Sequence, residues 1–197
     1  MNAVPQNLVS VQQFFSWLAN QEGRFELVNG QIRMMAGATY RHNQVKNNVT
    51  VALTPLARAC GCGSTTSDTG VQTGEHGIRY PDVVIDCGPQ SPNSMTVNNP
   101  VIVVEISSPS TRGTDLGVKL YEHQNLDAVQ MIIQIEPDVI DVAVHRRAPG
   151  GWVVEVYQTQ HALIDLPPLK GSLAVTDIYF GLDVRPRPTF QVVGENP

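Results

Sequence analysis

Two short segments rich in Val and Ile place the strongest constraint on the fold of this chain. The first, residues 80–86, carries Asp82, and the second, residues 100–107, carries Glu105. Short continuous runs of β-branched residues predict buried strands. A carboxylate within such a strand is costly unless it is paired or binds a metal ion. The sequence therefore predicts two central strands, each with an acid that needs a partner.

Length and composition agree with an ordinary globular fold. The chain has 197 residues, of which 42% are hydrophobic and 16% charged, which is typical of a soluble α/β protein. We expect one domain over residues 1–197, with a core from about residue 10 to residue 183. From Arg185 onward three prolines predict an extended C-terminal tail.

Charge and hydropathy exclude some classes of protein. No apolar run approaches the roughly 20 residues that span a bilayer. The first residues lack the basic region and cleavage site of a secretory signal, so we expect a cytoplasmic protein without a membrane partner. The net charge of −5 argues against strong non-specific binding to nucleic acid. A local basic patch, or one completed by a dimer, remains compatible with that charge.

The cysteines predict no covalent framework. There are three, an odd number, and they form no paired C-x-x-C motif. Neither a disulfide scaffold nor a structural zinc site is expected. The pair Cys60 and Cys62 is interpreted as small residues at the end of a helix, and a soft metal site is the alternative.

Periodicity and turn residues predict a mixed α/β order of elements. Asn29-Gly30 between two apolar runs indicates an N-terminal β-hairpin. The expected helices cover residues 11–18, 40–59 and 111–124, and the expected strands cover residues 64–73, 80–86, 100–107, 129–135, 139–145 and 152–158. We therefore predict a mixed central β-sheet flanked by α-helices.

The two acids suggest a metal site if their strands are neighbours. Side chains alternate between faces along a strand, so Glu105 shares a face with Ser107. Asp82 and Glu105 could then converge at one end of the sheet. Such oxygen ligands suit Mg²⁺, which can activate water and stabilise charge on a phosphoryl group. For either acid alone, a solvated carboxylate or a salt bridge is the alternative.

Several short motifs together resemble one family. They are Glu26 to Gly30, His42, Pro81-Asp82, Glu105 to Thr111, Asp115, Lys119 and Tyr121. This pattern resembles the Uma-type branch of the PD-(D/E)XK nuclease superfamily, a bacterial group described as restriction endonucleases. The resemblance implies a restriction-endonuclease-like fold and Mg²⁺-dependent hydrolysis of DNA, with Mn²⁺ as an alternative ion. It also implies that Asp82, Glu105 and the main-chain carbonyl of Ile106 bind the metal.

One position departs from the superfamily pattern. The superfamily places a lysine two residues after the glutamate, where this chain has Ser107, as the Uma-type branch also does. Lys119, on the following helix, could return its ammonium to the sheet and stabilise negative charge there. The alternative is an exposed pair between Lys119 and Asp115, four residues apart on the helix. Ser107 is a possible outer metal ligand.

His42 and Glu26 complete the candidate site. His42 falls on the apolar face of its helix, where it could contact phosphate or relay a proton, or be a hydrogen-bonded core residue. Glu26 could be an outer metal ligand, although an ion pair with Arg24 or Arg33 is the favoured alternative. The other histidines share no metal-ligand spacing and are expected to be surface or structural residues: His76, His123, His145 and His161.

These observations support one leading hypothesis and two alternatives. The leading hypothesis is a Mg²⁺- or Mn²⁺-dependent endonuclease that acts on DNA as a homodimer, the commonest symmetric oligomer. The first alternative is a non-catalytic binding module on a nuclease-like scaffold, because a fold alone does not fix a function. The second is a metal-dependent hydrolase of a smaller phosphoester.

Overall fold

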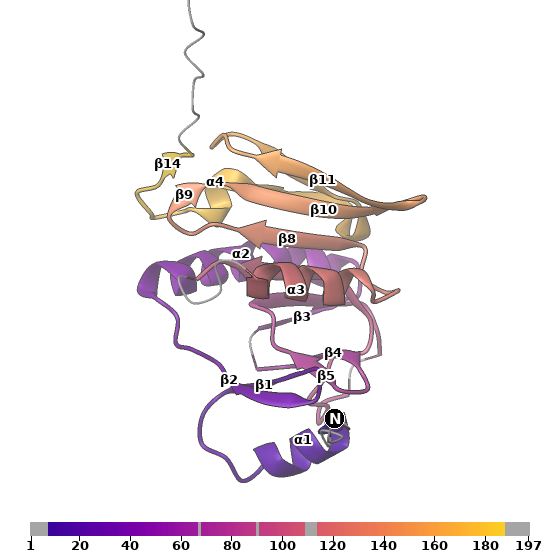
Figure 1. Ribbon diagram of the computed structural model, residues 1–197. Helices are drawn as coiled ribbons and strands as arrows, with labels where there is room; N and C mark the ends of the chain where they lie inside the picture. The colour runs from indigo at the N-terminus through magenta and orange to yellow at the C-terminus, as the bar shows by residue number, and fades with distance from the viewer. Residues whose placement is uncertain (1–7, 67, 90, 109–113, 188–197) are drawn as a thin grey trace, which may run out of the picture.

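The computed structural model describes residues 8–66, 68–89, 91–108 and 114–187 (Figure 1). The helices are α1 (Val11–Leu18), α2 (Tyr40–Ala59), α3 (Thr114–Gln124) and α4 (Val175–Ile178), with a 3₁₀ turn, η1 (Pro167–Leu169). The strands are β1 (Phe25–Val28), β2 (Gln31–Met34), β3 (Gly63–Thr66), β4 (Val71–Gly74), β5 (Gly77–Arg79), β6 (Val83–Asp86), β7 (Pro100–Ile106), β8 (Met131–Ile135), β9 (Val139–Ile140), β10 (Val142–Ala148), β11 (Gly151–Tyr157), β12 (Leu163–Leu166), β13 (Gly171–Ala174) and β14 (Arg185–Pro186).

A six-stranded mixed sheet forms the centre of the molecule, in the order β11-β10-β8-β7-β6-β3. Strands β7 and β8 are parallel, and the other neighbours are antiparallel. Strands β6 and β7 pair directly, with Val83 opposite Val104. The condition for a shared site, that the two acid-bearing strands are neighbours, is therefore met.

Helices cover both faces of this sheet. On one face Ile102 and Val104 pack in the same buried cluster as Val49 and Leu53 of α2. On the other face Val103 packs in a cluster with Leu120 of α3. Because side chains alternate along β7, Glu105 lies on the same face as Val103 and points toward α3. The mixed sheet with flanking helices confirms the predicted fold class.

A second, four-stranded sheet has the order β2-β1-β5-β4 and lies beside the first (Figure 1). Strands β1 and β2 form the predicted hairpin, and its turn residues Asn29 and Gly30 have φ values of 48° and 75°. Helix α1 packs on this sheet through Phe14, which is buried with Leu27 and Ile78. The small sheet therefore has its own apolar core.

Two regions predicted as single strands contain passages of the chain between the two sheets. The predicted strand 80–86 was too long, since β5 ends at Arg79 in the small sheet and β6 begins at Val83 in the central sheet. Pro81 lies between them, where its missing N–H cannot join a ladder. Likewise residues 64–73 form β3 and β4, which belong to different sheets. Asp82 consequently lies at the passage from one sheet to the other.

The prediction that the cysteines form no disulfide was wrong. Cys62 and Cys87 are bonded, with their Cα atoms 4.2 Å apart. They lie one position beyond the cross-strand pair of Gly63 and Asp86, so the pairing of β3 with β6 brings them together. Their separation of 25 residues hid this contact in the sequence. Cys60 is free and half-buried at the end of α2.

The C-terminal third adds elements that the sequence reading missed. The hairpin of β12 and β13 and the short helix α4 contribute Ile164, Leu173 and Ile178 to the core beneath α2. The tail begins as β14, which pairs in parallel with β9. Residues 188–197, and residues 111–113 of the predicted third helix, lie outside the described residues. No helix within the described ranges is long and apolar enough to cross a membrane.

Candidate active site

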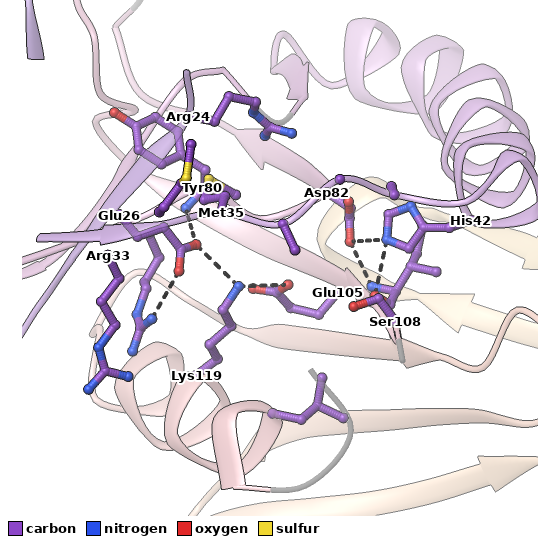
Figure 2. Close-up of a pocket in the computed structure, with 17 residues that line it drawn as sticks. Arg24, Glu26, Arg33, Met35, His42, Tyr80, Asp82, Glu105, Ser108 and Lys119 are labelled. Carbon is purple, nitrogen blue, oxygen red and sulfur yellow. Dashed lines mark hydrogen bonds and ion pairs between the residues drawn. The ribbon is translucent and has the colours of Figure 1, made fainter. Parts of the chain in front are cut away.

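A cleft between the two sheets gathers the predicted site residues. Its volume is about 340 Å³. Figure 2 shows Lys119 between Glu26 and Glu105, with Asp82 and His42 beyond Glu105. Five elements or junctions supply these side chains: β1, the β5–β6 junction, β7, the start of α2, and α3.

Asp82 is fixed against the end of β7. Its Oδ2 atom accepts a hydrogen bond of 2.9 Å from the main-chain N–H of Ile106. The Nε2 atom of His42 lies 3.3 Å from the same Oδ2 and 3.2 Å from the carbonyl oxygen of Ile106. Because both of these oxygens are acceptors, Nε2 must carry a proton. The Asp82 carboxylate and the Ile106 carbonyl therefore both face the Nε2–H of His42.

The first turn of α2 positions His42. Thr39 caps the helix, and its side chain accepts a hydrogen bond of 3.2 Å from the main-chain N–H of His42. Burial lowers the pKa of His42, but the hydrogen bond and charge of Asp82 outweigh it, so that the pKa is raised above its ordinary value. Within the described residues Nδ1 has no hydrogen-bond partner. The interactions of the ring therefore all face Asp82 and Ile106.

Glu105 is held by His123 and Lys119, two side chains of α3. The Nε2–H of His123 donates to Oε1 over 3.1 Å, and Nζ of Lys119 lies 3.8 Å from Oε2. His123 has no exposed surface. His123 was expected to be a surface or structural residue, and its contact with Glu105, a proposed metal ligand, was not predicted. Its position in the sequence, four residues after Lys119 on one helix face, was the available signal.

Lys119 reaches into the cleft from α3. Its Nζ donates to Oε1 of Glu26 over 3.1 Å, and the residue is only 6% exposed. The alternative, a solvent-exposed ion pair at the surface of the helix, does not fit this buried ammonium. The long side chain thus returns a positive charge to the sheet, close to Glu105.

Glu26 pairs with residues other than those expected. Its favoured partners were Arg24 and Arg33, but the structure pairs it with Lys119 and with Arg79, whose Nη1 lies 3.0 Å from Oε2. Burial raises the pKa of Glu26, and the charges of Lys119 and Arg79 together outweigh it, so that the pKa lies below its ordinary value. The predicted ion pair of Glu26 with Arg24 or Arg33 was therefore wrong. The observed partners, Arg79 and Lys119, lie on other elements that are remote in the sequence.

Arg79 is a further residue of the site, besides His123, that the sequence did not indicate. It is 1% exposed and forms two hydrogen bonds with Glu122, of 2.6 and 2.9 Å, besides its bond with Glu26. Such bidentate pairs hold both partners in one geometry. Arg79 therefore joins β1 to α3 and supports the position of Lys119. The signal in the sequence was an arginine at the end of an apolar strand, directly before Tyr80-Pro81-Asp82.

The cleft holds the kinds of oxygen donor that a hard divalent cation takes, but the structure does not gather them around one point. Asp82 and the Ile106 carbonyl both face His42, whereas Glu105 is turned toward His123 and Lys119. In the described part of the chain no group of three or more His, Cys, Asp and Glu side chains is arranged to hold a metal. Oxygen donors of this kind suit Mg²⁺ or Mn²⁺. Ser107 is 2% exposed, and Ser108 rather than Ser107 lines the cleft.

Comparison with known proteins agrees with this fold and cleft. Residues 11–177 match the family model "Uma2: Putative restriction endonuclease", and the chain belongs to this family. It is similar to the uncharacterized protein slr1290 of Synechocystis sp., with 28% identity over 178 residues that cover 88% of this chain and 93% of the relative.

A solved structure extends the comparison to three dimensions. The chain resembles a protein from Anabaena variabilis described as a putative nuclease belonging to DUF820, with a TM-score of 0.68 and 19% identity. The match covers 86% of this chain and 97% of that protein. At this identity the likeness establishes the fold alone.

Proposed function

We propose that this protein is a metal-dependent endonuclease that hydrolyses phosphodiester bonds of DNA. Family membership and the fold support the nuclease class. The observation that carries the proposal is the shared cleft of Asp82, Glu105 and Lys119, which Ile106 also lines. This set combines oxygen ligands for a cation with an ammonium for developing negative charge.

Each residue has a definite role in the proposed reaction. Asp82, Glu105 and the Ile106 carbonyl hold the divalent ion, which when bound polarises the phosphoryl oxygen and lowers the pKa of a bound water. Lys119 directs its ammonium at the negative charge that develops on the phosphoryl group. Glu26 keeps that ammonium in place through the bond of 3.1 Å. His42 holds a proton at Nε2 beside Asp82 and can exchange it with a reacting oxygen.

Glu105 provides the observation that favours a second candidate, a non-catalytic binding module. Its carboxylate is already paired with His123 and Lys119 and is buried. If these pairs are permanent, the cleft is a closed ionic network that binds no cation. This candidate predicts neither cleavage nor affinity for divalent ions.

A cleavage assay combined with metal titration separates the two candidates. Plasmid and linear DNA are incubated with Mg²⁺ or Mn²⁺ and the wild type, Asp82→Asn, Glu105→Gln or Lys119→Met. We expect each substitution to lower the rate by about 100-fold or more, whereas Asp127→Asn, at an exposed acid outside the cleft, serves as the matched control. Calorimetry with Mn²⁺ gives a readout besides activity. Equal cleavage by all variants, or no Mn²⁺ binding by the wild type, would refute the proposal.

We also propose that the active protein is a homodimer located in the cytoplasm. A two-fold dimer is the commonest symmetric assembly of proteins, which supports this proposal. Light scattering coupled to gel filtration measures the mass, and a monomeric mass throughout the active concentration range would contradict the dimer.

A further inference from the structure

The proposed catalytic groups are recessed within the cleft. The exposed fraction of the side chain is 15% for Asp82, 7% for Glu105 and 8% for Lys119. A cleft of about 340 Å³ lies near the lower end of the range for ligand sites, roughly 300–1,000 Å³. Such a volume suits one nucleotide unit, and a base-paired segment would have to open before its phosphate reached the acids.

The rim of the cleft carries exposed groups of the kind that bind a flexible strand. Residues 33–40 lead from β2, an edge strand, to the start of α2 (Figure 1). Within this segment Met34 is 73% exposed and Tyr40 is 80% exposed. The ring of Tyr40 offers a face on which a base can stack, and Met34 offers an apolar contact. Met34 and residues 35–38 line the cleft, and Tyr40 follows them closely in the chain.

Arg33 supplies a positive charge on the same rim. It is exposed, lines the cleft, and pairs across the hairpin with Glu26 in the strand register. The Glu26 carboxylate is already bound by Lys119 and Arg79. Among the residues that the structure describes, Arg33 forms no ion pair of its own. Its guanidinium is therefore available to a phosphate next to the one that enters the cleft.

From this arrangement we infer that the cleft takes an unpaired nucleic-acid strand rather than an intact duplex. Arg33 binds a phosphate that flanks the scissile one, and Met34 and Tyr40 contact bases. The net charge of −5 provides little general attraction for a duplex, so these local contacts decide what binds. The inference rests on the proposed function, since it names the substrate of the same site.

Equilibrium binding in EDTA tests the inference apart from cleavage. Fluorescence anisotropy is measured for a short labelled DNA strand, for the same strand annealed to its complement, and for an RNA strand of the same sequence. We expect either single strand to bind at least about tenfold more tightly than the duplex. Arg33→Ala should make the salt dependence less steep by about 0.7 in the log–log slope. Tyr40→Ala should weaken binding about fivefold or more.

Matched variants far from the rim serve as controls. Arg58→Ala removes an exposed arginine from the last turn of α2, and Val154→Ala removes an apolar side chain that is 54% exposed on β11, an edge strand of the central sheet. Both should bind the single strands as the wild type does. Equal or tighter binding of the duplex, or wild-type binding by Arg33→Ala and Tyr40→Ala, would overturn the inference. If only the proposed function is wrong, the protein neither cleaves DNA nor binds Mn²⁺, but it still binds single strands more tightly than the duplex.

Discussion

Replacement of Arg79 by methionine should destabilise the protein more than any exposed charge substitution. The guanidinium is 1% exposed and makes hydrogen bonds of 2.6, 2.9 and 3.0 Å to Glu122 and Glu26. Removing one partner of a buried ion pair leaves the other charge uncompensated, which costs about 3–5 kcal/mol. For a chain of this size each kcal/mol lowers the melting temperature by about 2–4 °C. Arg79→Met should therefore melt roughly 6–20 °C below the wild type.

Urea denaturation of Arg79→Met, of Glu122→Gln and of two further variants tests this reasoning. Arg41→Met removes a partly exposed arginine that lies 3.7 Å from Asp138 and donates to the carbonyl of Asp183, and it should cost less than about 1 kcal/mol. In the double variant Arg79→Met/Glu122→Gln the carboxylate that lost its partner is neutral, so the loss should be smaller than the sum of the single losses. If Arg79→Met costs no more than Arg41→Met, the buried network does not stabilise the fold as argued.

Three further predictions concern stability. Reducing the disulfide between Cys62 and Cys87, which closes a separation of 25 residues, should lower the free energy of unfolding by about 3.5 kcal/mol, and an unchanged urea midpoint with and without reductant would contradict this. The pKa of His42 is raised, so its stabilising interaction with Asp82 is complete below about pH 6.5 and is lost as the pH rises through the raised value. In urea titrations of the wild type the free energy of unfolding should therefore fall over that range of pH. His42→Gln should abolish this dependence on pH. The pKa of Glu26 is lowered, so its contribution to the free energy of unfolding is complete above about pH 4.5 and is lost as the pH falls through the lowered value. If a Glu26→Gln variant loses stability in acid as the wild type does, Glu26 is not the group responsible.

Local sequence patterns predicted the parts of the fold that depend on neighbours along the chain. The runs of Val and Ile predicted β6 and β7, Asn29-Gly30 predicted the hairpin turn, and apolar spacing predicted α2. These local patterns could not predict where the chain leaves one sheet and enters the other. The break at Pro81, which puts Asp82 between the two sheets, is visible only when both ladders are known.

The candidate site shows the same division. Asp82, Glu105 and Lys119 were selected from the sequence, and all three line the same cleft. Arg79 and His123 were not selected, because an arginine ending a strand and a histidine on a helix are common and have no distinctive spacing. Their partners, Glu26 and Glu105, come from other elements of the fold.

The sequence by itself determined the family, the two acid-bearing strands and the lysine that follows them on a helix. The tertiary structure decided how these groups are paired. It turned Glu105 toward His123, placed Arg79 between two carboxylates, and joined Cys62 to Cys87. The physical reason is range: propensity and periodicity act between residues a few positions apart, whereas ion pairs and disulfides depend on which strands and helices are neighbours.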